Sequence, residues 1–142
     1  MLPHNHFLIA GLVIAPVGLL DHKTISQVIQ LALVGGFASS ALDLDVYISV
    51  LLKSRQESRL KKFTNPLTIY RQFDLFMDTL METGIWKTGL WTHPFLSIAI
   101  ILLTYIYWPA FYLPVALGLI SHLISDVPNL KRILKIRGGR NK

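Results

Sequence analysis

The chain has 142 residues, of which 52% are hydrophobic and only 15% are charged. Together with a mean hydropathy of +0.48, this composition indicates a membrane protein rather than a soluble domain. The absence of cysteine excludes disulfides, cysteine-ligated zinc and a thiol nucleophile. The net charge of +6 does not predict a nucleic-acid partner, because the basic blocks lack the base-reading motifs and interleaved aromatic residues of such modules. The length fits one domain, residues 1–142.

Two uncharged segments, residues 7–20 and 25–42, open the chain. The first rises only about 21 Å as a helix, so it needs flanking residues or local thinning to cross a bilayer. A polar turn, Asp21-His22-Lys23, separates the two, and Thr24 or Ser26 can cap the second helix. Small residues at 35–41 predict close helix packing.

Residues 53–92 are predicted to form a cytoplasmic loop. Its first part, Lys53 to Lys62, is charged throughout and indicates contact with solvent or anionic lipid headgroups. Apolar residues at helical spacing then predict one amphipathic helix over 66–82, which packs across the bundle or lies on the membrane surface. We expect Gly84 and Gly89 to end this helix.

Residues 94–125 carry no charge, and this length lies between one membrane span and two. The Trp108-Pro109 and Leu113-Pro114 steps favour a break near the middle. We therefore expect two helices, 94–108 and 113–127, followed by a basic tail, 131–142, whose end is loosely ordered at Gly138-Gly139. The predicted fold is an all-α integral membrane bundle of about four short transmembrane helices plus the cytoplasmic amphipathic helix.

Antiparallel packing of these four helices brings the polar residues of the apolar segments to one side of the membrane. Thirteen of the 14 Lys and Arg residues lie on the same side, and the positive-inside rule then makes that side cytoplasmic. The expected protein is a multi-pass protein of the cell (inner) membrane with both termini in the cytoplasm. The polar residues concerned are His6, Asp43, Asp45, His93, His122 and Asp126.

Carboxylates and imidazoles at membrane depth are costly, and they are usually paired or functional. A divalent metal ion accepts both nitrogen and oxygen ligands, so zinc, manganese or a metal pair suits this set. We predict all six residues as metal ligands and all except His6 as catalytic, because such a site activates water for hydrolysis. Taken singly, Asp43 and Asp126 are equally compatible with ending or capping helices. His22 lies on the opposite side and is assigned no role.

The order of four elements resembles the YdjM-like membrane-bound metal-dependent hydrolases. These elements are Asn-His at 5–6, Leu-Asp-Leu-Asp at 42–45, Trp-Thr-His-Pro at 91–94 and Ser-His-Leu-Ile-Ser-Asp at 121–126. The resemblance implies the same six ligands and a hydrolytic activity, without fixing a substrate. The chain departs from the family pattern at Leu42, where the family has Pro, at Val46, where it has His, and at Lys87-Thr88-Gly89, where a His is missing. These departures leave open one metal instead of two, an electrostatic role for Lys87, or an inactive site.

The principal hypothesis is a membrane-bound hydrolase that acts at the cytoplasmic face on a phosphoester or lipid-like substrate, with membrane lipid as its partner. The alternative is an inactive scaffold or anchor that recruits a partner through the amphipathic helix or the basic tail. An ion or proton relay is a third possibility, but it needs polar residues that continue to the other side. Phosphatases of the phosphatidic-acid type are set aside, because their Pro-Ser-Gly-His element and basic cluster are missing. The sequence leaves the oligomeric state open.

Overall fold

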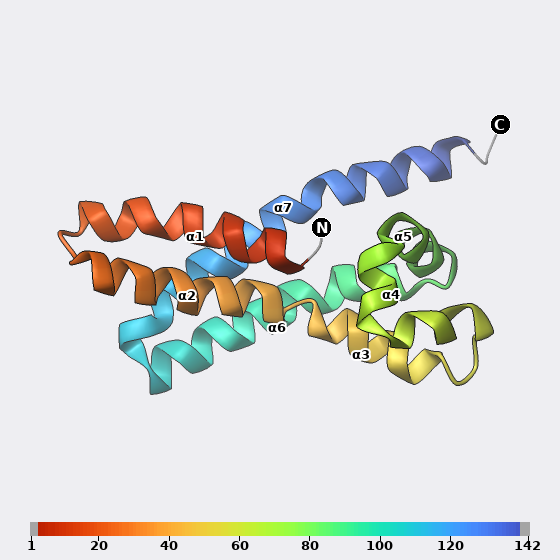
Figure 1. Cartoon of the computed structure of the whole chain (residues 1–142), viewed down its shortest axis with the longest axis horizontal. Coiled ribbons are helices and arrows are strands. Elements are labelled where there is room, and N and C mark those ends of the chain that lie inside the picture. Colours follow the sequence, from red (N-terminus) through yellow and green to blue (C-terminus); the bar gives the residue numbers. More distant parts are fainter. Residues whose placement is uncertain (1–2, 140–142) are drawn as a thin grey trace.

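The computed structural model describes the backbone of residues 3–139 and the side chains of residues 3–127. This part of the chain is helical and contains no strand, which confirms the all-α class. Figure 1 shows the arrangement of the helices. In chain order the elements are α1 (Pro3–Leu20), α2 (Ile25–Ala41), α3 (Leu44–Lys53), η1 (Ser58–Thr64), α4 (Pro66–Arg71), α5 (Phe73–Glu82), α6 (Ile85–Tyr107), η2 (Pro109–Phe111) and α7 (Tyr112–Gly139).

Helices α1 and α2 form an antiparallel hairpin with a capped turn. The Lys23 amide donates to the Gly18 carbonyl, and His22 adopts a left-handed conformation with φ 53°. Thr24 then caps α2 through a capping box, in which its hydroxyl accepts from the Gln27 amide and the Gln27 side chain accepts from the Thr24 amide. The turn therefore satisfies backbone groups that both helix ends would otherwise leave free.

The four expected spans are present as helices long and apolar enough to cross a membrane. They cover Pro3–Leu20, Ile25–Lys53, Ile85–Tyr107 and Pro109–Val127 within the described residues. The break near the middle of the long uncharged run is confirmed, because α6 ends at Tyr107 and η2 precedes α7. α2 and α3 are joined by a short junction at Leu42 and Asp43, so together they form one 29-residue candidate span.

The outer surface of these helices is apolar. Many large apolar side chains are exposed, and Leu12, Leu20 and Ile25 are more than 70% exposed. No more than 33% of any span is buried inside the protein. Such a continuous apolar exterior is too large for a soluble protein. The protein is therefore a membrane protein, whose exterior is covered by lipid.

Two glycines set the closest helix contact in the bundle. A Cβ atom built on Gly118 of α7 would lie 2.2 Å from the Gly35 carbonyl oxygen of α2, and one built on Gly35 would lie 2.5 Å from the Pro114 carbonyl oxygen. No other residue fits at this distance, so the backbones of α2 and α7 touch. This is the small-residue packing expected from residues 35–41.

A second packed core lies at one end of the bundle, which we call the end cluster. It joins α3, η1, α5 and the start of α6 through eight buried apolar side chains: Val46, Val50, Leu60, Phe63, Phe76, Met77, Leu80 and Ile85. Arg59 ties η1 to α5 at the surface by pairing with Glu57 and Glu82. Its hydrogen bonds lower the pKa of the Glu57 carboxyl.

Several expected boundaries were wrong. The amphipathic helix over 66–82 is two helices, because Gln72 adopts φ −125° and ψ 44° between α4 and α5. α6 begins nine residues before Pro94 and continues through it, so Gly89 lies inside a helix and does not end one. The segment from Lys53 to Lys62 is not solvated throughout, since Leu60 is fully buried in the end cluster. α7 continues to Gly139, past the expected end at residue 127.

The ends of the helices are arranged as antiparallel packing of the four spans predicts. Figure 1 shows the turn between α1 and α2 and the turn between α6 and α7 at the same end of the molecule, on the left, while the start of α1 and helices α3 to α5 lie toward the other end. The polar residues of the spans therefore gather on the side of the end cluster.

Candidate metal centre

The six predicted ligands come from four separated parts of the chain and meet at one place. His6 lies on the second turn of α1, and Asp43 sits in the junction between α2 and α3. Asp45 lies in the first turn of α3, and His93 lies in the third turn of α6. His122 and Asp126 lie one turn apart on α7, as i and i+4 spacing requires.

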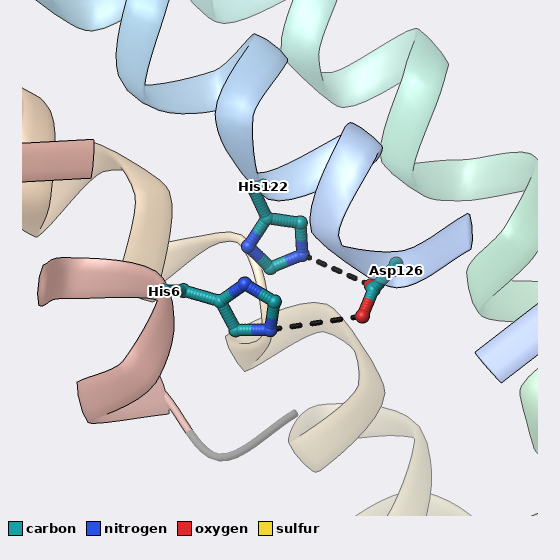
Figure 2. A group of neighbouring side chains, drawn as sticks. All are labelled: His6, His122 and Asp126. Carbon is teal, nitrogen blue, oxygen red and sulfur yellow. Dashed lines mark ion pairs between the residues drawn. The ribbon is translucent and has the colours of Figure 1, made fainter. Parts of the chain in front are cut away.

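His6, His122 and Asp126 form the first group of possible ligands. Their nitrogen and carboxylate atoms all lie within 4.8 Å of one another. Figure 2 shows the two imidazoles beside each other, with the Asp126 carboxylate in front of both. His6 Nε2 lies 3.7 Å from Asp126 Oδ1, and His122 Nε2 lies 3.4 Å from Asp126 Oδ2. The two rings stack with a centroid separation of 3.9 Å.

Asp43, His93 and His122 form the second group, which also satisfies the 4.8 Å limit. Asp43 Oδ1 lies 3.9 Å from His93 Nε2 and 3.7 Å from His122 Nε2. Its other oxygen, Oδ2, lies 3.9 Å from His6 Nε2. His122 belongs to both groups and Asp43 faces all three histidines, so the two groups are parts of one continuous cluster.

Asp45 holds a different place from the other five residues. Its Oδ2 lies 3.0 Å from His93 Nδ1 and also accepts a short hydrogen bond from the Thr92 hydroxyl. It belongs to neither ligand group. Donation from His93 Nδ1 to Asp45 leaves the Nε2 lone pair of a neutral imidazole directed at Asp43. A carboxylate behind a histidine is the arrangement that orients imidazole ligands in metal sites.

His6 is oriented in the same way by a hydroxyl. Ser125 Oγ lies 2.8 Å from His6 Nδ1 and donates its proton to the His122 carbonyl at 2.8 Å. Because the single hydroxyl proton is used there, Ser125 accepts from the His6 Nδ1–H. The lone pair of His6 is thus on Nε2, the atom that faces Asp43 and Asp126.

The inward-facing atoms lack hydrogen-bond partners. His6 Nε2, Asp43 Oδ2 and His122 Nε2 are all buried and make no hydrogen bond with described atoms. Both His6 and His122 have side chains that are 0% exposed. Buried polar atoms are normally satisfied, so a group of orphaned atoms that face each other is a place that could hold a metal ion.

The separations between these atoms fit one or two divalent cations. Two ligand atoms about 2.0 to 2.2 Å from a tetrahedral ion lie roughly 3.3 to 3.6 Å apart. The five nitrogen–oxygen separations of the cluster run from 3.4 to 3.9 Å. They are too long for direct hydrogen bonds, and they lie at or a few tenths of an ångström above the range of shared coordination. The mixed imidazole and carboxylate donors suit zinc or manganese.

Two polar neighbours were absent from the sequence-based prediction. Thr92 and Ser125 contact the site only through Asp45 and His6. Both lie within the Trp-Thr-His-Pro and Ser-His-Leu-Ile-Ser-Asp elements that suggested the site, but the sequence offers no sign of which imidazole each would face. Their roles depend on contacts between distant helices.

Two of the three departures from the family pattern, at Val46 and at Lys87-Thr88-Gly89, have a structural counterpart. Val46 is 8% exposed and belongs to the end cluster. A Cβ atom on Gly89 would meet Val46 Cγ2 at 3.0 Å, so apolar packing occupies the place where the family pattern has histidine. Lys87 is exposed and takes no part in the described hydrogen bonds of the cluster.

In comparisons with known proteins, no family model, no curated protein and no solved structure matches the chain.

Proposed function

We propose that this protein is a membrane-bound, metal-dependent hydrolase that acts on a phosphoester or lipid-like substrate at the cytoplasmic face of the cell (inner) membrane. The observation that carries the proposal is the cluster of orphaned, buried ligand atoms on His6, Asp43 and His122. Three buried imidazoles gathered with three partly buried carboxylates have no structural benefit comparable to their cost unless a cation compensates them.

The residues divide into two roles. His6, Asp43, His93, His122 and Asp126 would hold the metal, since each belongs to a ligand group. Asp45 and Ser125 would orient His93 and His6. The two oxygens of Asp43 face different histidines, so this carboxylate could bridge two ions, which supports a metal pair as readily as a single ion.

A divalent ion here would supply Lewis acidity and lower the pKa of a bound water. Hydrolysis of a phosphoester consumes one water: its oxygen bonds to phosphorus, the bond from phosphorus to the ester oxygen breaks, and the departing alcohol oxygen takes a proton. The side chains would fix the position of the phosphoryl group relative to the water. Asp43 and Asp126 are 25% and 13% exposed, so the cluster is open to small molecules along its carboxylates.

Metal content tests the site. The variant Asp43→Asn with His122→Asn removes two ligands with little change in volume, and Asp21→Asn with His22→Asn makes the same two changes in the α1–α2 turn, away from the cluster. Purified in detergent and dialysed against zinc or manganese, the wild type and the turn variant are expected to retain metal and the site variant to lose it. Equal metal content in all three would overturn the metal site.

Turnover tests the chemistry. Chromogenic phosphomonoester, phosphodiester and carboxylester substrates in mixed micelles are offered to metal-loaded protein. We expect metal-stimulated hydrolysis of at least one phosphoester, abolished by chelator and by the site variant. A protein that binds metal through the cluster but hydrolyses none of them would instead be a scaffold with a structural metal.

The membrane orientation has its own test, because the chain contains no cysteine. Single cysteines are introduced at Lys23, in the turn between the first two spans, and at Lys61, in η1. A membrane-impermeant maleimide applied to intact cells should label Lys23→Cys, and should label Lys61→Cys only after permeabilisation. The reverse pattern would place the site on the outer face.

A further inference from the structure

A cavity of about 210 Å³ lies directly beside the metal cluster, between α3, α6 and α7. His93 and Asp126 form part of its wall. The rest of the lining is apolar: Val46, Trp86, Gly89, Leu90, Pro94, Leu123 and Val127. The cavity therefore has a polar end at the ligands and an apolar body, which is the character of a site for an amphiphilic molecule.

The mouth of the cavity lies between two membrane spans. Val127 of α7 is 45% exposed, and Pro94 of α6 is also exposed, whereas Val46 on the inner wall is buried. Both mouth residues belong to candidate spans. An apolar chain can thus enter sideways from the bilayer while its polar end moves toward the His and Asp side chains.

Trp86 lines two adjacent cavities. Together with Val46 and Asp126 it also borders a second, smaller cavity of about 90 Å³, which includes Asp43 and residues of α4 and α5. Both cavities therefore flank the Asp126 carboxylate.

We infer that the substrate of the proposed hydrolase is an amphiphilic phosphoester whose alkyl chain occupies this cavity and whose phosphate lies at the His and Asp cluster. The inference rests on the proposed function for the phosphate and on the cavity for the chain. A cation held by the cluster favours an anionic oxygen-rich group over a neutral one.

The size of the cavity predicts a chain-length limit. Its volume of about 210 Å³ exceeds that of an engineered apolar cavity of about 150 Å³ that holds the six carbons of benzene, so by proportion it holds roughly eight carbons. Each methylene transferred from water to an apolar site strengthens binding by about fourfold. Affinity should therefore rise with alkyl length to about seven or eight carbons, and longer chains, which extend past the mouth, should gain little more.

Fluorescence quenching measures binding without turnover. In a background of Trp91→Phe with Trp108→Phe, Trp86 is the sole tryptophan of the chain. The protein is kept in amphipol so that no bulk lipid competes for the probe. Two probes are titrated: 8-bromooctanol, which tests the cavity alone, and 8-bromooctyl phosphate, which tests the cavity together with zinc at the cluster. Ethyl, butyl, octyl and dodecyl phosphates serve as competitors.

A matched pair of variants locates the binding. Val127→Phe narrows the mouth, whereas Ile124→Phe adds the same ring to a lipid-exposed position of α7 that does not line this cavity. We expect Val127→Phe to weaken quenching by both probes by roughly tenfold, corresponding to the loss of room for about two methylenes, and Ile124→Phe to leave it unchanged. Equal quenching in the two variants, or affinity that keeps rising to dodecyl phosphate, would overturn the cavity as the chain site.

The experiments distinguish failure of the proposed metal centre from failure of the proposed amphiphilic substrate. If 8-bromooctanol binds and Val127→Phe blocks it, but zinc does not strengthen binding of 8-bromooctyl phosphate, the cavity stands and the phosphate assignment falls. If the metal-content test succeeds and neither probe quenches Trp86, the metal centre stands and the amphiphilic substrate falls.

Discussion

Replacing Gly118 with alanine should damage both the fold and the metal centre. The added Cβ would lie 2.2 Å from the Gly35 carbonyl oxygen, whereas ordinary contact begins near 3.4 Å. The obstructing atom belongs to the backbone of α2 and cannot rotate away. α7 must therefore move from α2 by roughly 1 Å, and overpacking of this kind costs about 1 to 3 kcal/mol.

The same displacement reaches the ligands. His122 and Asp126 follow Gly118 by one and two helical turns and move with it. Metal sites tolerate ligand displacements of only about 0.2 Å, and disturbance of ligand placement typically lowers metal affinity by about 10- to 100-fold. We expect zinc affinity to fall by that factor in Gly118→Ala.

Gly11→Ala is the matched control, because a Cβ atom at Gly11 of α1 meets nothing within 4 Å. Unfolding is followed by circular dichroism during titration of SDS into mixed micelles, and zinc affinity by competition with a fluorescent chelator. Gly11→Ala should match the wild type in both. If Gly118→Ala matches it too, the backbone contact between α2 and α7 neither limits stability nor places the ligands.

Two further changes probe a ligand orienter and a helix cap. Ser125→Ala removes the acceptor for His6 Nδ1 and should lower zinc affinity by about tenfold. The control Ser97→Ala removes a buried hydroxyl without a described partner and should leave zinc affinity unchanged. If the chelator competition gives equal zinc affinities for the two variants, Ser125 does not orient His6 for metal binding. Thr24→Ala breaks the capping box of α2 and should lower the free energy of unfolding in mixed micelles by about 1 kcal/mol, with Ser26→Ala as control. An unshifted unfolding midpoint for Thr24→Ala would show that the α1–α2 turn does not depend on its cap.

The parts of the fold that the sequence predicted well are those governed by charge and hydropathy. Uncharged runs predicted four spans, and the Trp108-Pro109 step predicted the break between the last two. Successive antiparallel helices start and finish on alternate sides of the membrane. The helix ends that carry the six polar residues therefore fall on the same side. These inferences use only the cost of polar groups in lipid and the length of a helix.

Local boundaries were harder, because they depend on tertiary contacts. Pro94 looked like a helix start, yet α6 runs through it and begins at Ile85, which is fully buried in the end cluster. Gln72 separates α4 from α5 although the apolar spacing continues across it. In both places, packing against the end cluster decides a boundary that propensity alone assigns elsewhere.

Within the cluster, the sequence predicted which residues meet but not how each of them is placed. Asp43 and Asp45 look alike as Asp-Leu-Asp, yet one faces three histidines and the other lies behind His93. A difference of two residues at the start of α3 points them in different directions. Side-chain direction around a helix junction, rather than residue type, makes this distinction.

The contact between Ser125 and His6 joins residues 119 positions apart, and this separation has a consequence for biogenesis. During synthesis α1 enters the membrane long before α7 has been made, so His6 and Asp43 reach the bilayer without the partners that α7 supplies. The first hairpin must tolerate these polar groups until the last span arrives. Completion of the cluster thus coincides with insertion of the last span, and a product truncated before α7 would carry an unfinished polar cluster in the membrane.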